Sequence, residues 1–194
     1  MSKHATSKAQ LRSNMRSYLA TTSKDHIQSC SITIAHHIAS AHELLVKSKT
    51  IAIYAAIQNE ISLSKLHKLI PDKQLLYPRC QPGHRLSFHH VTNENQLILN
   101  SMQIPEPQPC LHPELDTDQI DMILCPGLAF GIDGTRLGRG QGYYDRALDG
   151  FSGIKLGIAL DHQITASVPQ TIQDATMDSL VSESGIYITK PAQG

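Results

Sequence analysis

The stretch from Asp121 to Leu148, DMILCPGLAFGIDGTRLGRGQGYYDRAL, predicts the fold more clearly than any other part of the chain. It opens with the apolar run Met122 to Cys125, which is typical of a short buried strand. Pro126-Gly127 ends that run, and a glycine-rich turn from Arg136 to Gly142 follows. A helix is expected from about Gly142 to Leu148. A strand, a loop and a helix in this order are typical of an α/β protein.

The glycine-rich turn also suggests chemistry. Gly138, Gly140 and Gly142 let the backbone bend through positive φ and come close to a ligand. Their amide hydrogens can converge on an anion, and Arg136 and Arg139 can bind phosphate oxygens. The spacing differs from that of the P-loop and of the dinucleotide fingerprint. Taken alone, the turn is a weak signal, and a flexible hairpin or an ordinary helix-capping loop is the alternative interpretation.

An aromatic and acidic cluster follows the turn directly. Asp145 is close enough in sequence to hold a magnesium ion against bound phosphates. Tyr143 and Tyr144 offer two rings on which a heterocycle could stack. The stretch thus combines phosphate donors, a cation site and stacking surfaces within ten residues.

Composition restricts the class of protein. The 194 residues are 40% hydrophobic and 18% charged, which predicts one folded domain, residues 1–194, with a single core. A formal net charge of zero argues against a nucleic-acid binder driven by a general positive field. No apolar run reaches the roughly 20 residues that span a bilayer. The first residues lack the apolar core of a signal peptide, so a cytoplasmic location is expected.

Cysteine and histidine form no recognisable metal motif. The four cysteines lie far apart without a CxxC pair and are expected to be free thiols. The eleven histidines include two adjacent pairs, and adjacent residues do not share a face of a helix or strand. Solvated histidines are favoured over a metal site, and none receives a role.

Outside the first stretch, the hydrophobic period switches between helical and extended. Helices are expected at Lys8 to Leu19, about Asp25 to Val46, and Ile61 to Ile70. Strands are expected at Thr50 to Ile57, Gln74 to Tyr77, Leu86 to Val91, Gln96 to Leu99, Ile154 to Leu160 and, once or twice, within Ser182 to Thr189. A proline-rich loop is expected from Ser101 to Pro113. The alternation predicts an α/β sandwich with a mostly parallel sheet.

Ligands of such sheets bind in the crevice beyond the carboxyl ends of the strands. The segments Tyr54 to Glu60 and Pro126 to Gly142 both follow strand ends, so we expect them to face one cleft. On the N-terminal helix, Lys8, Arg12 and Arg16 form a basic stripe at helical spacing. A solvated helix face is the alternative interpretation of that stripe.

As a whole, PGLAF followed by RLGRGQGYYDR strongly resembles the signature of the 5-formyltetrahydrofolate cyclo-ligases, also called methenyltetrahydrofolate synthetases. Further landmarks occur in that family's order along nearly the whole chain: Lys8 and Arg12, Tyr54 to Glu60, Tyr77-Pro78-Arg79, Ile104 to Pro107, and Pro169, Asp174 and Asp178. Three positions depart from the family, because Gly131 replaces its usual Asp, Leu63 a common Thr, and Gln173 its His or Asn. The Gly131 departure bears on how the phosphate loop is braced.

The resemblance implies a three-layer α/β/α sandwich like that of the sugar-phosphate isomerase and CoA-transferase group. It implies a ligase that uses ATP and Mg²⁺ to convert 5-formyltetrahydrofolate into 5,10-methenyltetrahydrofolate, ADP and phosphate. The γ-phosphoryl group passes to the formyl oxygen, N10 attacks the resulting iminium phosphate, and phosphate leaves. Such chemistry needs alignment and charge neutralisation rather than a protein nucleophile. A monomer that binds neither nucleic acid nor membrane is expected.

The resemblance also assigns residues to roles. The catalytic residues would be Lys8, Arg12, Arg139, Tyr143 and Asp145. The ATP contacts would be Lys8, Ala9, Gln10, Leu11, Arg12, Arg136, Leu137, Gly138, Arg139, Gly140, Gln141, Gly142, Tyr143, Tyr144 and Asp145. The folate contacts would be Ala55, Glu60, Arg139, Gly140, Gln141, Gly142 and Tyr143. Asp145 and Asp174 would hold magnesium.

Alternative interpretations remain open at this point. Without the resemblance, Glu60 is equally a carboxylate at the start of a helix, and Asp174 is a residue of a polar surface turn. The chain could instead be another phosphate-using α/β enzyme, such as a sugar-phosphate isomerase. It could also be an RNA-associated binding module that uses the basic residues as a patch, which neutral net charge argues against.

Overall fold

The computed structural model describes residues 7–171 and 174–189. An eight-stranded sheet with the order β13-β12-β10-β7-β1-β2-β3-β6 forms its centre. The strands are β1 (Thr50–Ala52), β2 (Gln74–Gln81), β3 (Arg85–His90), β6 (Glu114–Leu115), β7 (Met122–Cys125), β10 (Ile154–Ile158), β12 (Ser179–Ser182) and β13 (Gly185–Ile188). The five strands from β12 to β2 run parallel, and antiparallel pairs stand at both edges. The predicted mostly parallel α/β sheet is confirmed.

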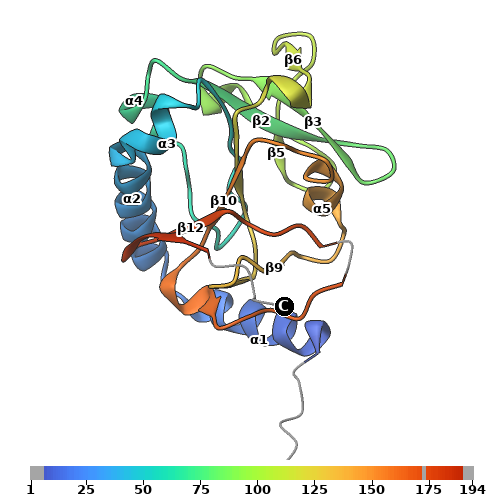
Figure 1. Ribbon diagram of the computed structural model, residues 1–194. Coiled ribbons are helices and arrows are strands. Elements are labelled where there is room, and N and C mark those ends of the chain that lie inside the picture. Colours follow the sequence, from blue (N-terminus) through green and yellow to red (C-terminus); the bar gives the residue numbers. More distant parts are fainter. Residues whose placement is uncertain (1–6, 172–173, 190–194) are drawn as a thin grey trace, which may run out of the picture.

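Helices lie on both sides of this sheet (Figure 1). They are α1 (Lys8–Thr21), α2 (Lys24–Ser40), α3 (His42–Val46), α4 (Leu66–Leu69) and α5 (Tyr143–Ala147). Alternate residues of each central strand point to opposite faces. Ile51 of β1 therefore packs with α2 in one core cluster, while its neighbour Ala52 joins a second cluster with Phe130 and Leu148. Because both faces of the sheet are buried, the sequences of the central strands are continuous apolar runs.

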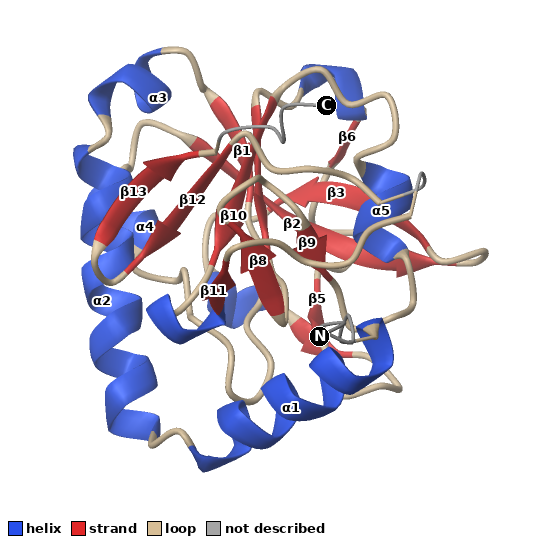
Figure 2. Cartoon of the chain, turned by 60° about the horizontal axis from the view of Figure 1, so that its bottom comes forward, coloured by secondary structure: helices blue, strands red, loops and turns tan. Residues whose placement is uncertain are grey.

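A second, three-stranded sheet lies beside the central one (Figure 2). It contributes Ala129 and Leu137 to the first core cluster and Phe130 to the second. It consists of β8 (Ala129–Gly131), β9 (Arg136–Leu137) and β11 (Ile164–Thr165), in the order β11-β8-β9. The sequence patterns did not predict this sheet, because strands of two or three residues are too short to show a hydrophobic period. The glycine-rich turn follows β9 of this small sheet and lies at the carboxyl end of β7.

Several predicted boundaries are wrong. The single helix expected from Asp25 to Val46 is broken at Ala41, whose ψ of 68° is not helical, and the turn lets Leu45 of α3 join the core. The helix expected from Ile61 shortens to α4, because residues 61–63 form no helix and a turn at residues 64–65 leads into Leu66. The strand expected from Thr50 to Ile57 ends at Ala52.

Other differences arise from long-range pairing. β2 continues past the predicted end at Tyr77 to Gln81, because β3 pairs with it along that length. Part of the predicted proline-rich loop forms β5 (Pro105–Glu106), which pairs with β4 (Ile98–Leu99). β12 begins at Ser179, before the predicted segment. Within residues 7–171 and 174–189, no helix is long and apolar enough to cross a membrane.

The departure at Gly131 has a local explanation. A Cβ there would lie 2.2 Å from both Asp133 Oδ1 and Thr135 Oγ1. Asp133 Oδ1 in turn accepts hydrogen bonds from Thr135 N at 3.0 Å and from Thr135 Oγ1 at 2.6 Å. The Asp133 carboxylate thus fills the space that a side chain at residue 131 would take and braces the turn before β9. Gln173, another departure, lies outside the described residues.

Gly157 of β10 offers a test of the packing between the two sheets. A Cβ there would lie 2.7 Å from Leu180 Cδ2 and 2.7 Å from Phe130 Cε1. We expect Gly157→Ala to lower the free energy of unfolding by about 1–3 kcal/mol, the usual cost of overpacking a core. Urea denaturation would measure it. Phe130→Leu should recover part of the loss in the Gly157→Ala background, whereas strictly additive losses would contradict the contact.

Candidate active site

A cavity of about 220 Å³ lies at the carboxyl ends of β1 and β7. Segments that follow these strands, the second half of β2 and the glycine-rich turn form its walls. It is lined by Tyr54, Ala55, Ile57, Glu60, Pro78, Cys80, Leu86, Met102, Ile104, Glu106, Pro126, Gly127, Arg136, Gly138, Arg139, Gln141, Gly142, Tyr143, Tyr144 and Asp145. The prediction that Tyr54 to Glu60 and Pro126 to Gly142 face one cleft is confirmed.

The glycine-rich turn has the backbone geometry that its residues suggested. The φ angle is 106° at Gly140 and 72° at Gly142, in the region that favours glycine. Gly142 is the N-cap of α5, so the turn leads directly into a helix start. Gly138 is not among the residues with positive φ; a Cβ there would come within 3.0 Å of Arg136 Nη1.

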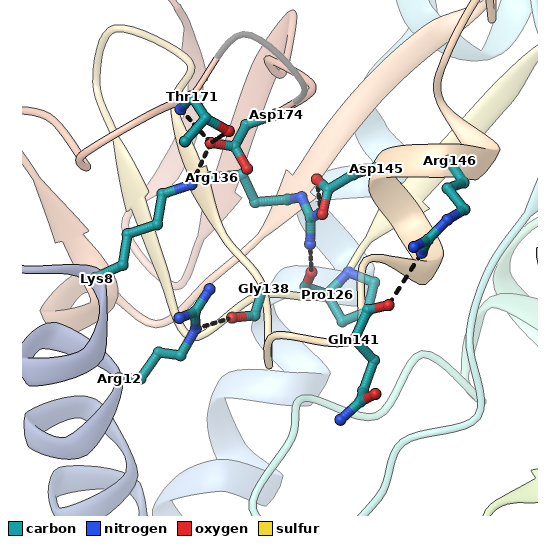
Figure 3. A network of polar contacts seen from close by, with 10 residues as sticks. All are labelled: Lys8, Arg12, Pro126, Arg136, Gly138, Gln141, Asp145, Arg146, Thr171 and Asp174. Atoms are coloured by element: carbon teal, nitrogen blue, oxygen red, sulfur yellow. Dashed lines mark hydrogen bonds and ion pairs between the residues drawn. The ribbon is translucent and has the colours of Figure 1, made fainter. Parts of the chain in front are cut away.

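Arg136 is a buried cation that organises the turn (Figure 3). Its Nη2 donates to Asp145 Oδ1 at 2.6 Å, and its Nη1 donates to the Pro126 carbonyl at 3.2 Å. The guanidinium also lies 5.7 Å from the ring centroid of Tyr144. One side chain therefore joins β9, the end of β7 and α5. The arrangement gives Arg136 a role in positioning Asp145.

The three cations of α1 all reach across to other parts of the chain. Arg12 Nε donates to the Gly138 carbonyl at 3.0 Å, and Arg16 Nη2 donates to the Arg139 carbonyl at 3.0 Å. Lys8 forms an ion pair with Asp174. Figure 3 shows Lys8 and Arg12 extending from the helix toward these partners. Lys8 and Arg12 are partly buried by these contacts and do not form a merely solvated stripe, whereas Arg16 remains exposed.

Asp174 is held in place by more than one donor. Thr171 donates to it through the hydroxyl at 3.0 Å and through the backbone amide, in addition to the Lys8 ammonium. Burial acts to raise the pKa of Asp174, but these hydrogen bonds outweigh burial and leave the pKa below its ordinary value. Asp174 is therefore an ionised, anchored carboxylate beside the N-terminal helix, rather than a free side chain of a surface turn.

Glu60 and Arg139 connect the two sides of the cleft. Arg139 donates to Glu60 Oε1 through Nη2 at 2.8 Å and Nε at 3.0 Å, and Glu60 Oε2 accepts from Ile57 N at 3.1 Å. Glu60 lies in a turn, whereas α4 begins only at Leu66, so the interpretation of Glu60 as a helix-start carboxylate is wrong. The ion pair bridges the glycine-rich turn and the segment after β1.

Some residues expected in the site lie outside the cavity wall. Gln10 is exposed and donates to Asn14 Oδ1, and Leu11 packs against the hydrophobic core. Leu137 is buried and does not line the cavity. Lys8, Ala9, Arg12, Gly140 and Asp174 also do not line the cavity, although Arg12 and Gly140 adjoin it: an ideal Cβ at Gly140 lies 3.6 Å from Arg12 Nε.

The cavity also contains residues to which the sequence assigned no role. Glu106 is buried, and its Oε1 accepts from Cys80 N at 3.0 Å and from Asn100 Nδ2 at 2.8 Å. Burial, followed by the hydrogen bond to Glu106, raises the pKa of Cys80 to about 11. Glu106 lies in a landmark of the family resemblance and Cys80 directly follows another, which was the signal available. Their meeting depends on the packing of β5 against β2, which no local pattern predicts.

Comparisons with known proteins agree with this geometry. The model of the 5-formyltetrahydrofolate cyclo-ligase family matches residues 4–183. A probable 5-formyltetrahydrofolate cyclo-ligase of Caenorhabditis elegans is 27% identical over 196 residues, covering 93% of this chain and 95% of the relative. The 5-formyltetrahydrofolate cyclo-ligase of Mus musculus is 27% identical and covers 89% and 92%.

A solved structure extends the likeness to three dimensions. The NMR structure of Aquifex aeolicus 5,10-methenyltetrahydrofolate synthetase matches with a TM-score of 0.83 and 29% identity, covering 96% of this chain and 95% of that one. The family match spans the two segments that line the cleft, after β1 and at the glycine-rich turn, and also α1, which contacts that turn. The chain belongs to the 5-formyltetrahydrofolate cyclo-ligase family and is an enzyme of that ligase class.

Proposed function

We propose that this protein cyclises 5-formyltetrahydrofolate to 5,10-methenyltetrahydrofolate at the expense of ATP. The observation that carries the proposal is the single cleft described above. There the glycine-rich turn, the carboxylate Glu60 and apolar walls meet, with the cations of α1 directly behind the turn. Family membership supports this substrate pair over other phosphate-using reactions.

The residues at the turn suit phosphoryl transfer, which needs positioning and charge neutralisation. The positive-φ backbone at Gly140 lets amide groups approach the triphosphate closely. Arg12 and Lys8 would neutralise phosphate charge from the α1 side, and Arg139 stands between nucleotide and folate. The formyl oxygen accepts the γ-phosphoryl group, N10 closes the ring, and the C–O bond to phosphate breaks. Each proposed residue stabilises charge or orients a substrate, and none forms a covalent bond.

The opposite wall suits a folate ring. Tyr54, Met102 and Ile104 line it with apolar surface. Burial raises the pKa of Tyr54 well above its ordinary value, so the ring stays neutral. Glu60 and the buried Glu106 supply carboxylate acceptors for the N–H groups of a pterin. Because Glu60 is ion-paired with Arg139, a folate that bonds to Glu60 would share it with that arginine.

The carboxylates at the site fit magnesium in their chemistry. Magnesium is usually held by one or two carboxylates together with substrate phosphates and water. Asp145 pairs with Arg136 through Oδ1 alone, and Oδ2 takes no part in that bond. Asp174, which lies outside the cavity wall and is paired with Lys8, would be the second ligand. A bound magnesium ion would neutralise charge on the transferring phosphates.

The distribution of charge disfavours the RNA-binding alternative. Three cations that would form such a patch are paired with carboxylates: Lys8 with Asp174, Arg136 with Asp145, and Arg139 with Glu60. A surface that attracts RNA presents uncompensated positive charge. This pairing instead suits a site whose ions rearrange around a bound triphosphate and cation.

The reaction itself is the first test. We expect the purified chain, given 5-formyltetrahydrofolate, ATP and Mg²⁺, to form methenyltetrahydrofolate and ADP in equal amounts. The absorbance of the methenyl product and a coupled ADP assay would measure them. Omission of ATP or of Mg²⁺ should stop product formation, whereas turnover of a sugar phosphate without ATP would favour the isomerase alternative. Folded protein that forms no methenyl product under these conditions refutes the proposal.

Arg12 and Arg16 form a matched pair for testing the role of α1. Each donates one hydrogen bond to a carbonyl of the glycine-rich turn, but only Arg12 is proposed to contact substrate. Loss of a hydrogen bond to a charged group predicts a fall in kcat/KM of about 10- to 100-fold for Arg12→Ala. Arg16→Ala should change kcat/KM much less. Arg12→Lys should retain only part of the activity, because lysine lacks the planar guanidinium group.

Steady-state kinetics with each substrate varied would separate effects on ATP from effects on folate. Equal and small changes in Arg12→Ala and Arg16→Ala would show that both arginines act only on the conformation of the turn.

Gly140 and Gly150 form a second matched pair. Both have positive φ, and an added Cβ meets only ordinary contacts at Gly140 and nothing within 4 Å at Gly150. An alanine at either position should cost about 1–2 kcal/mol of stability through backbone strain. Only Gly140→Ala should also weaken binding of ATP, measured by calorimetry with Mg²⁺ and a non-hydrolysable analogue. Unchanged affinity together with raised stability would remove Gly140 from the proposed phosphate site.

A further inference from the structure

A thiol, an imidazole and a carboxylate meet away from the cleft, between α2 and the β12–β13 turn. His26 and Cys30 stand one turn apart on α2, and Glu183 comes from the turn that follows Ser182. The three donor atoms all lie within 4.8 Å of one another. Cys30 is buried, His26 is exposed and Glu183 is half-buried, so the group opens to solvent on the histidine side.

The spacing of the first two donors matches a tetrahedral metal site. Cys30 Sγ lies 3.6 Å from Nε2 and 3.9 Å from Nδ1 of His26. A zinc ion holds sulfur at about 2.3 Å and imidazole nitrogen at about 2.0–2.1 Å, so two such ligands at a tetrahedral angle are about 3.5 Å apart. The i, i+4 spacing on one helix face fixes this pair before any ion binds.

The third donor is oriented by its own neighbours. Glu183 Oε2 accepts a hydrogen bond from Asp161 N at 3.0 Å. The Asp161 carboxylate is itself bound by the hydroxyls of Ser182 and Ser184, on either side of Glu183. His37, farther along α2, lies 3.2 Å from the Glu183 carbonyl through Nε2. Supports of this kind, which hold a ligating carboxylate in place, are typical of metal sites.

The local electric field favours a cation. Burial is the main cause that raises the pKa of Cys30, and the negative charges of Glu183 and Asp161 raise it further. The same negative charges would attract a divalent cation, and metal coordination deprotonates a thiol.

We propose that His26, Cys30 and Glu183 form a binding site for a thiophilic divalent cation such as Zn²⁺. On binding, the Cys30 S–H bond breaks, the proton passes to solvent, and a sulfur–metal bond forms. Neutral His26 and ionised Glu183 supply the second and third ligands, and water completes the tetrahedron. Small rotations of His26 and Glu183 bring their donors inward. The ion ties α2 to the β12–β13 turn and takes no part in the proposed folate reaction.

Cobalt titration of the reduced, tag-free chain tests this site, because thiolate coordination to Co²⁺ gives a charge-transfer absorption that oxygen ligands do not. We expect one Co²⁺ per chain with this absorption. Zn²⁺ should displace the ion, in line with the order of divalent affinities. Excess Mg²⁺ should not, because magnesium prefers oxygen ligands.

Variants identify the ligands. Cys30→Ser should abolish the charge-transfer absorption, and His26→Ala and Glu183→Gln should each weaken Co²⁺ binding by more than about tenfold. Cys110→Ser is the matched control, because Cys110 is an exposed free thiol elsewhere, and it should bind like the parent. His26→Ala removes an exposed side chain, so it remains informative if Cys30→Ser fails to fold.

Absence of thiolate absorption in the folded parent overturns the proposal. So does absorption lost in Cys110→Ser but kept in Cys30→Ser, or unchanged affinity in both His26→Ala and Glu183→Gln. In the last case the short Cys30–His26 contact is only a weak hydrogen bond. None of these readouts involves folate or ATP, so the result stands whatever the outcome of the cyclisation assay.

Discussion

The ion pair between Arg136 and Asp145 is the contact on which the geometry of the cleft depends. A buried guanidinium is tolerated only when a carboxylate and hydrogen-bond acceptors compensate its charge. Arg136 meets both conditions by reaching Asp145 and the Pro126 carbonyl. It thereby fixes the end of β7, the short strand β9 and the start of α5 relative to one another. The glycine-rich turn lies between those anchors, so its backbone is held even where glycine would leave it free.

The N-terminal helix completes the site from a distance of more than one hundred residues in sequence. Arg12 and Arg16 bind successive carbonyls of the turn, and Lys8 binds Asp174 near the other end of the chain. These contacts place positive charge on the α1 side of the turn. They engage its carbonyl groups and leave its amide groups for a ligand. The N-terminal helix therefore contacts both the glycine-rich turn and Asp174, although all three segments are far apart in sequence.

Charge at the cleft is compensated in pairs. Each proposed phosphate-binding cation except Arg12 has a carboxylate partner, and each proposed magnesium ligand has a cationic one. Because the pairs are local, binding of a triphosphate with its metal ion would exchange partners without leaving a buried charge alone. The cleft differs in this respect from the group on α2, where burial and the negative charges of Glu183 and Asp161 raise the pKa of the Cys30 thiol.

Local patterns determined the class of fold, the central strands and the residues of the glycine-rich turn, because hydrophobic period, glycine and proline act over a few residues. Met122 to Cys125 and the α5 region could be located in this way, and resemblance in motif order identified the family. Contacts between distant segments decided the rest: the length of β2, the small sheet that carries Arg136, the break at Ala41 and the entry of Glu106 into the cavity. Contacts between distant segments also decided the position of Glu60, which is ion-paired with Arg139, and of Glu183, which lies close to Cys30. Such pairings depend on strand register and packing across the whole domain, and no short stretch of sequence encodes them.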